Sequence, residues 1–243
     1  MEPPWSILGG VKPAAPRSYR SARRAEQSRR TRGRVLDAAT AIFPVRGYAG
    51  TTMLAIAQAS GVSLPTVELL YRTKAGVLQA AIDRAIAGDD EAVPVLDRPS
   101  VRAALAATHP DELLGIVADV LVPTQERSAG LVLAAFEGAS TSPELAALAG
   151  QLIAQREVTA AWIVDALART ATLRPDCSRD EAVETVWALM DPALHVRLVR
   201  DRHWTADRYR VWFTRSVRRL LTPDATAPRQ PAPRPRGPYP EGR

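Results

Sequence analysis

The sequence has very little cysteine and no long apolar run, and both deficits restrict what the protein can be. Cys177 is the only cysteine among the 243 residues, so the chain cannot form an intramolecular disulfide or a thiolate metal cluster. No apolar stretch approaches the roughly 18 to 20 residues needed to cross a bilayer, and the first residues lack the pattern of a signal peptide. We therefore expect a cytoplasmic protein with no membrane partner.

Sequence patterns of catalysis are also missing. There is no glycine-rich phosphate loop and no nucleophile elbow. Asp191 and His195 stand four residues apart on one helical face, where they could form an acid–base pair or two metal ligands. Because Asp191 precedes Pro192, its position favours helix capping instead. His109 and His203 are too isolated to complete a site. The sequence thus predicts no catalytic residue, no metal and no cofactor, and a protein that is not an enzyme.

Positive charge is concentrated at the amino-terminal end. The formal net charge of the chain is +6, whereas residues 1–34 alone carry +7 and the other residues sum to −1. The basic residues of this segment are Lys12, Arg17, Arg20, Arg23, Arg24, Arg29, Arg30, Arg32 and Arg34. Such an arm binds a polyanion such as nucleic acid, or it only keeps a flexible tail solvated, and charge alone does not decide between the two.

Both ends of the chain look unpacked. Residues 1 to about 27 mix proline, serine and arginine without an apolar period, and residues 223–243 contain seven prolines. Proline-rich segments favour an extended conformation, and these have too few apolar side chains to join a core. We therefore expect a disordered basic arm over residues 1–27 and a disordered tail over residues 223–243.

Almost everything between the two ends has a helical pattern. Signals for helix starts recur along the chain, each a capping residue before a helical segment or a proline followed by acidic residues. They are Ser100, Pro110, Ser142, Ser178 with Glu181, Asp191 and Thr205. No alternating apolar segment of useful length suggests a strand. The sequence predicts an all-α protein of about nine or ten helices.

Residues 51–74 contain two short apolar patterns on either side of Gly61. Thr51 or Thr52 can cap a first short helix, and Ser63 can cap a second. Gly61 can adopt the left-handed conformation that a tight turn needs. This is the spacing of a helix-turn-helix motif, over residues 51–70.

Two apolar residues fit a pair of helices that cross closely. Ala57 is small where the helices would meet, and Val67 would turn back against the first helix. Both would join a small core with the helix that contains Val35 and Phe43. The outward face of the second helix would then be free to enter a major groove. Its residues are Leu64, Pro65, Thr66, Glu68 and Leu69.

The surroundings of this motif resemble a known family. The stretch RVLDAATAIFPVRGYAGTTMLAIAQASGVSLPTVELLYRTKAGVL resembles the amino-terminal domain of the TetR family of transcriptional regulators along its whole length. The shared features are VLDAA and IF, then GY and TT, IA, SGVS and PT, the aromatic Tyr71, and TK. The resemblance implies a DNA-binding domain over residues 28–88. It also implies an effector-binding and dimerisation domain over residues 89–222.

Carried over residue by residue, the resemblance implies contacts with the DNA backbone. The positions are Thr51 or Thr52, Ser63, Thr66, Tyr71 and Lys74, and we add Arg30 and Arg32 of the arm. Several lie at helix starts, where free N–H groups and the positive end of the helix dipole suit a phosphate. The family usually has a tyrosine where this chain has Glu68. That carboxylate could accept from a cytosine amino group, or it could be solvated and contact nothing.

The resemblance also implies a ligand and a partner for the second domain. Phe136, Trp162 and Trp187 could line a cavity for an apolar small-molecule effector, or they could pack in the core. A helix expected over 206–221 has a broad apolar stripe. Its residues Tyr209, Trp212, Phe213 and Val217 are candidates for a dimer interface, in a four-helix bundle about a two-fold axis.

Together these features predict a sequence-specific regulator that binds double-stranded DNA. We expect a homodimeric repressor that a small molecule releases from a palindromic operator. An activator or a ligand-independent regulator would have the same fold. A non-specific basic DNA-binding protein would use the arm alone and would show no preference for a palindrome.

Overall fold

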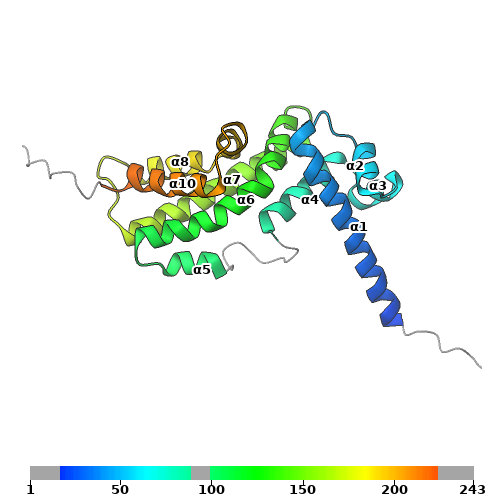
Figure 1. Cartoon of the computed structure of the whole chain (residues 1–243), viewed down its shortest axis with the longest axis horizontal. Coiled ribbons are helices and arrows are strands. Elements are labelled where there is room, and N and C mark those ends of the chain that lie inside the picture. The colour runs from blue at the N-terminus through cyan, green and yellow to red at the C-terminus, as the bar shows by residue number, and fades with distance from the viewer. Residues whose placement is uncertain (1–16, 89–98, 224–243) are drawn as a thin grey trace, which may run out of the picture. The chain divides into compact units, whose positions relative to one another are not determined.

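The computed structural model of the chain describes residues 17–88 and 99–223. Within these ranges the chain forms ten α-helices, one π-helix and no strand, which confirms the predicted all-α class (Figure 1). The α-helices are α1 (Arg17–Arg46), α2 (Met53–Ser60), α3 (Leu64–Tyr71), α4 (Lys74–Ala87), α5 (Pro99–Ala106), α6 (Pro110–Gly138), α7 (Pro143–Thr170), α8 (Arg179–Leu189), α9 (Pro192–Val196) and α10 (Ala206–Leu221). The π-helix is Arg197–Asp201. Residues 1–16 of the predicted arm and 224–243 of the predicted tail lie outside the described residues.

Packing divides the chain into two compact units. Unit 1 comprises Met1–Glu91 and Glu126–Leu152, and unit 2 comprises Ala92–Gln125 and Ile153–Arg243. The division falls inside α6 and α7, whereas the predicted boundary at residue 88 assigned both helices to the second domain. Leu131 of α6 and Leu145 of α7 are fully buried in the same core as α1, α2 and α4. Helices as short as α2 bury too little apolar surface by themselves. Residues from distant segments of the chain therefore complete the core of unit 1.

The first helix starts earlier than the folded domain that the sequence predicted. α1 begins at Arg17, although a disordered arm was expected up to residue 27. Glu26 accepts hydrogen bonds from Arg29 and, at 2.9 Å, from Arg30, and such pairs one turn apart support a helix. Side chains from residue 23 to residue 32 are exposed or half-buried. This stretch of α1 therefore has no apolar face, so its sequence contains no apolar period that would predict a helix.

Helices α2 and α3 form a pair that bends sharply at Gly61. Gly61 has φ +61° and ψ +30°, the left-handed conformation that the sequence predicted. The two helices are bent by 113°, within the roughly 90–120° of helix-turn-helix motifs.

No single helix in the described ranges is long and apolar enough to span a membrane. The bent pair of α2 and α3 reaches the required length and composition only when its two helices are counted together.

The core of unit 1 holds this pair against α1 and α4. Phe43, Ile56 and Leu78 are fully buried there, and Ala57 and Val67 join them as predicted. Complete burial of an apolar side chain of this size contributes about 1.5 to 3 kcal/mol. Since Val67 is the fully buried residue of α3, its position decides which face of that helix points outward.

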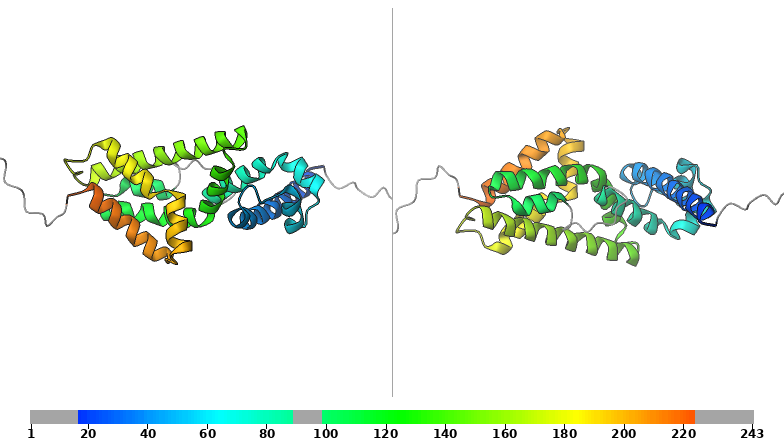
Figure 2. Two further views of the ribbon diagram at one scale, coloured as in Figure 1. Left: turned by 90° about the horizontal axis from the view of Figure 1, so that it is seen from above. Right: turned by 90° about the horizontal axis from the view of Figure 1, so that it is seen from below.

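Unit 2 has a core of its own, built by α5, α6, α7, α8 and α10. Leu113, Leu167 and Phe213 are among its fully buried residues. Helices α8 and α10 lie side by side, in yellow and orange (Figure 2). Ion pairs from α10 to α6 join Arg210 to Asp119 and Arg218 to Asp111.

Three predicted caps in unit 2 are confirmed. Ser178 and Glu181 form a complete capping box at the start of α8. The Asp191 carboxylate accepts from the Ala193 N–H at 2.8 Å, so Asp191 caps α9 as its position before proline indicated. Thr205 accepts from the Arg208 N–H at 3.2 Å and caps α10.

The apolar stripe of α10 is part of this core. Tyr209, Phe213 and Val217 are 0% exposed within the single chain, and Trp212 is half-buried. The prediction that this stripe forms a dimer interface is therefore wrong for the three buried residues. An amphipathic pattern shows that a helix buries one face, but it does not show whether the same chain or a partner covers it.

Candidate nucleic-acid interface

The outward face of α3 is narrower than the sequence suggested. Leu69 is 83% exposed, and Pro65 and Glu68 are exposed beside it. Leu64 and Thr66 are half-buried, and Leu64 packs against the core of unit 1. An exposed leucine next to a glutamate and a proline leaves an apolar surface with one carboxylate on a short helix.

Ser63 stands at the N-cap position of α3 without acting as the predicted cap. Its side chain accepts no hydrogen bond from a backbone N–H, and its hydroxyl pairs with the Thr66 hydroxyl at 2.7 Å. The amides of Thr66 and Val67 bond the Ser63 carbonyl oxygen at 3.0 and 3.1 Å. Two hydroxyl groups therefore lie at the amino end of α3, where the helix dipole favours an anion.

The structure distinguishes between the two candidate caps of α2. Thr52 is exposed, and its hydroxyl accepts from the Ala55 N–H at 3.1 Å. Thr51 is 0% exposed and donates to the Gly47 carbonyl oxygen at 2.7 Å. Thr52 is therefore the cap, and the buried Thr51 hydroxyl is directed into the protein and not toward a ligand.

Lys74 also points inward, against the prediction of a phosphate contact. Its ammonium donates to the carbonyl oxygens of Tyr48 and Thr51 at 2.7 and 2.8 Å. Burial lowers the pKa of Lys74, while the charge of Glu137 acts in the opposite direction. Two of the three ammonium protons are therefore used within the fold.

The Tyr71 hydroxyl is buried as well. It has no hydrogen-bond partner within the described ranges. Burial raises the pKa of Tyr71, and the positive charges of Arg32 and Arg84 act in the opposite direction. A buried hydroxyl group cannot contact a phosphate in this conformation, and Tyr71 packs against the core of unit 1.

Two arginines without a predicted contact lie at the edges of the motif. Arg34 of α1 donates to the carbonyl oxygens of Ser60 and Gly61, with distances of 2.6 and 2.7 Å from Nη2. It fixes the turn between α2 and α3. Arg72 is exposed and has φ +61°, in a γ-turn closed by the Thr73 N–H and the Tyr71 carbonyl oxygen at 2.6 Å. Neither role has a signal in residue type or spacing.

Arg30 and Arg32 remain on the surface of α1. Arg30 is bonded to Glu26 at 2.9 Å, and both arginines are exposed. Water and salt screen an exposed pair of this kind, so a phosphate could replace the carboxylate.

The end of α6 contacts the turn that leads into α2. The Glu137 carboxylate accepts from the backbone N–H groups of Tyr48 and Ala49 at 3.2 and 3.4 Å. At the start of α7, Glu144 accepts from the Thr73 hydroxyl at 3.2 Å. Both contacts lie inside unit 1, and they attach α6 and α7 to the segments before α2 and α4.

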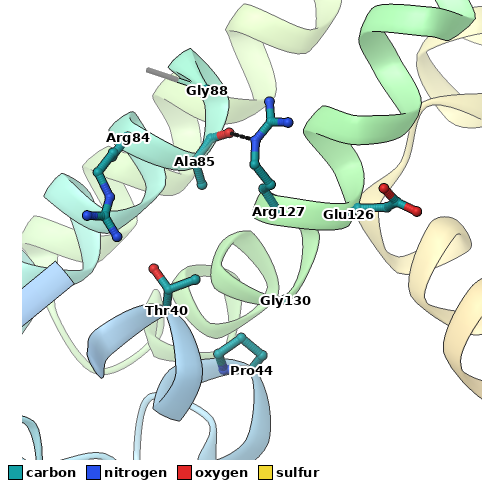
Figure 3. A pocket seen from close by; sticks show the side chains of 8 residues that line it. All are labelled: Thr40, Pro44, Arg84, Ala85, Gly88, Glu126, Arg127 and Gly130. Carbon is teal, nitrogen blue, oxygen red and sulfur yellow. Dashed lines mark hydrogen bonds between the residues drawn. The ribbon is translucent and has the colours of Figure 1, made fainter. Parts of the chain in front are cut away.

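The three aromatic residues predicted to line an effector pocket pack against two different cores. Phe136 packs against the core of unit 1, whereas Trp162 and Trp187 pack against the core of unit 2. A hollow of about 460 Å³ in unit 1 is lined by Thr40, Pro44, Arg84, Ala85, Gly88, Glu126, Arg127 and Gly130. Figure 3 shows Arg127 bonded to the Ala85 carbonyl oxygen, at 3.0 Å, and Glu126 directed away. The lining of this hollow mixes charged side chains with proline, alanine and glycine, and none of the three predicted residues is part of it.

Residues 35–81 match the model of the bacterial regulatory proteins, tetR family. This part of the chain, which contains α2 and α3, is therefore of the TetR type. The match covers the buried part of α1, all of α2 and α3, and α4 as far as Ala81, which is the region of the helix-turn-helix motif. No curated protein sequence matches the chain.

Solved structures extend this similarity to the fold of most of the chain. A protein from Saccharomonospora viridis in complex with choline is 19% identical, with a TM-score of 0.60 over 79% of this chain and 98% of its own. A TetR-family regulator from Cytophaga hutchinsonii is 18% identical, with a TM-score of 0.57 over 79% and 94%. A TetR regulator from Haloarcula marismortui is 17% identical, with a TM-score of 0.56 over 79% and 98%. At these identities the similarity establishes the fold alone.

Proposed function

We propose that this TetR-family protein is a homodimeric transcriptional repressor that binds a palindromic operator through α3 and that a small molecule releases. The observation that carries the proposal is the division of α3 into a buried and an exposed side. Val67 is 0% exposed, while Leu69 is 83% exposed in the motif that matches the family. A short helix anchored on one side and free on the other suits a major groove.

Recognition of the bases would rest on few polar groups. Pro65 and Leu69 can read sequence only through contact with thymine methyl groups or through the shape of the groove. Glu68 is the exposed polar candidate, and it would accept from a cytosine amino group. The hydroxyls of Thr52, Ser63 and Thr66 would hold phosphates at the two helix starts, together with Arg30 and Arg32.

Support for a homodimer comes from the charges on the outward faces of α8 and α10. The exposed residues of α8 include Asp180, Glu181 and Glu184, and those of α10 include Arg208, Arg215 and Arg219. A two-fold axis repeats every contact, so an interface that pairs α8 of one subunit with α10 of the other contains that pair twice. The acidic face would then meet the basic face twice, and complementary charges of this kind fix the register of an interface.

Release by a ligand is supported by the fold family. A protein of the same fold has been solved in complex with choline, which is an example of a small molecule bound in this architecture. A ligand lowers operator affinity only when it prefers the arrangement that does not bind DNA, and a tenfold effect needs about 1.4 kcal/mol of coupling.

Selection of duplexes from a randomised pool by the full chain tests the proposal. We expect enrichment of a palindrome whose half-site centres lie about 34 Å apart, one helical turn. Retention of DNA without an enriched sequence would instead support the non-specific basic protein. Enrichment of an asymmetric site would contradict the two-fold dimer.

A further inference from the structure

The hollow of about 460 Å³ in unit 1 lies where α1, α4 and α6 meet (Figure 3). Its volume falls within the range of about 300 to 1,000 Å³ that small-molecule sites have. The walls include Thr40 and Pro44 of α1, Arg84 and Ala85 of α4, and Arg127 of α6. We refer to this space as the three-helix hollow. The proposed DNA contacts use none of these residues, so the hollow is open to another role.

One side of the three-helix hollow is apolar. Gly130 of α6 has no side chain, and a Cβ atom there would lie 2.6 Å from Cβ of Pro44. The backbone of α6 therefore approaches the proline of α1 directly, and any side chain at residue 130 would push the two helices apart. Ala85 contributes only a methyl group. Proline, glycine and alanine thus form a surface on which the apolar body of a ligand can pack.

Two guanidinium groups make the rest of the three-helix hollow positive. Arg84 donates to the Asp37 carboxylate at 2.7 Å and to the Gly33 carbonyl oxygen at 3.4 Å, whereas a guanidinium has five N–H groups. Figure 3 shows the Arg84 guanidinium and the Thr40 side chain directed toward each other. Nε of Arg127 donates to the Ala85 carbonyl oxygen at 3.0 Å, which holds the second guanidinium beside the end of α4.

The negative groups nearby do not cancel this charge. Glu126 is directed away from the hollow (Figure 3). Asp37 pairs with Arg84 from outside the lining, and its side chain is 72% exposed, so water and salt screen that pair. The carbonyl groups at the end of α4 are the negative pole of that helix, and Arg127 already bonds one of them. The charge that faces the hollow is therefore positive.

This combination favours an organic anion over other ligands. Arginine forms short, charge-assisted hydrogen bonds with carboxylates, which are stronger than bonds between neutral groups. An ammonium group would be repelled by both guanidinium groups. A neutral ligand of the same shape would gain the apolar contact alone.

We propose that the three-helix hollow binds a small monocarboxylate. Its carboxylate accepts hydrogen bonds from the Arg84 guanidinium beside Thr40, Arg127 adds positive charge from α6, and its apolar body packs against Pro44. Such a ligand contacts α1 and α4, the two helices that hold α2 and α3 in the core of unit 1. Its effect on DNA rests on the proposed function above, whereas the binding itself does not.

The first experiment compares benzoate, benzamide and benzylamine as probes of the full chain at low salt, by titration calorimetry and by the shift in melting temperature. The three share an aromatic ring and carry a negative, a neutral and a positive group. Benzoate should bind at least about tenfold more tightly than benzamide, a difference of about 1.4 kcal/mol, and benzylamine more weakly than either. Equal affinity for benzoate and benzamide, or no binding of benzoate at millimolar concentration, overturns the proposal.

Two variants test the named residues. Arg84→Gln removes the charge and should weaken benzoate binding by about tenfold while benzamide binding stays the same. Because this variant also loses the bond to Asp37, a second variant leaves both arginines in place. Thr40→Met fills the three-helix hollow, and methionine suits a helix better than threonine, so the chain should fold but no longer bind benzoate. Unchanged benzoate affinity in either variant overturns the proposal.

A control and a DNA measurement complete the design. Arg200 is exposed in unit 2 and bonds Asp201 at 3.1 Å, so Arg200→Gln makes the same chemical change away from the hollow. It should leave benzoate binding unchanged. An equal loss in this control would show that benzoate follows the overall positive charge, and it would overturn the site. If benzoate binds through Arg84 but DNA affinity does not change, the site stands and the ligand-release part of the proposed function fails for this site.

Discussion

The Lys74 ammonium contacts Tyr48 in two ways, at the backbone carbonyl oxygen and at the aromatic ring. The Lys74 ammonium donates to the Tyr48 carbonyl oxygen at 2.7 Å and lies over the Tyr48 ring, 3.9 Å from its centroid. A second hydrogen bond, to the Thr51 carbonyl oxygen, attaches the start of α4 to the segment that precedes α2. Lys74, which the sequence predicted to contact a phosphate, thus supports the two helices of the motif.

Replacement of Lys74 by methionine should therefore destabilise the protein. The variant loses two hydrogen bonds from a charged donor and a cation–π contact, and each bond of that kind contributes about 1.5 to 3 kcal/mol. Allowing for partial compensation, we expect the free energy of unfolding to fall by about 2 to 4 kcal/mol in urea denaturation. A change below about 0.5 kcal/mol would mean that these contacts do not stabilise the fold.

The buried His195 predicts how stability depends on pH. Burial lowers its pKa below the ordinary value of about 6.5. Between its lowered pKa and about 6.5 the unfolded chain binds more protons at this residue than the folded chain. Stability should therefore fall as pH drops below about 6.5, by at most about 1.4 kcal/mol per pH unit from this residue.

The same measurement on His195→Phe isolates this residue from the other titrating groups. The difference in unfolding free energy between variant and wild type should grow as pH falls from 7 to 5. A difference that stays constant over this range would show that the histidine titrates equally in the folded and unfolded chains.

Reversal of charge on the outward faces of α8 and α10 tests the proposed dimer. Glu184→Lys and Arg215→Glu should each weaken self-association, by about fivefold to tenfold at low salt, because like charges then face each other. The double variant restores complementary charge with the signs exchanged, so its dimerisation should recover. Sedimentation equilibrium measures all four proteins. Equal association constants in all four proteins would show that the interface lies elsewhere. Glu112→Lys, at an exposed site on α6, is the control and should leave self-association unchanged.

The arginines of α1 should contribute to DNA affinity without regard to sequence. Each phosphate contact that is lost flattens the log-log salt dependence of the binding constant by about 0.9. Arg30→Ala and Arg32→Ala should therefore reduce that slope and weaken binding to all duplexes alike. Arg200→Ala removes an exposed arginine from unit 2 and should leave the slope unchanged. Full affinity and slope in both α1 variants would show that these side chains do not contact DNA.

Local signals were sufficient for much of the fold. Thr205 and Ser178 could be assigned as caps because a hydroxyl before a helical pattern satisfies N–H groups only a few residues away. Gly61 could be placed in the turn because few other residues adopt φ > 0 without strain. These features depend on neighbours in sequence, and the family resemblance over residues 28–88 adds the register of the motif.

The remaining features depend on contacts between distant segments. Whether Lys74 points to a phosphate or to the Tyr48 carbonyl oxygen is decided by the turn after α1. Whether the stripe that contains Phe213 faces a partner or its own chain is decided by α6 and α8, which cover it. The start of α1 at Arg17 relies on charged pairs in a segment without an apolar period, so its composition resembled that of a disordered arm.

The central claim is that the exposed side of α3 reads DNA, and a pair of matched variants tests it most directly. Leu69 on α3 and Val45 near the end of α1 are both 83% exposed, so an aspartate at either site costs little in folding. On the duplex selected by the wild-type chain, Leu69→Asp should lower affinity by about 100-fold, or about 2.7 kcal/mol, because a carboxylate would enter the groove in place of an apolar contact. Val45→Asp should change affinity by less than about threefold, or roughly 0.7 kcal/mol. If Leu69→Asp binds as well as the wild type, or if both variants lose affinity equally, α3 is not the helix that reads the operator.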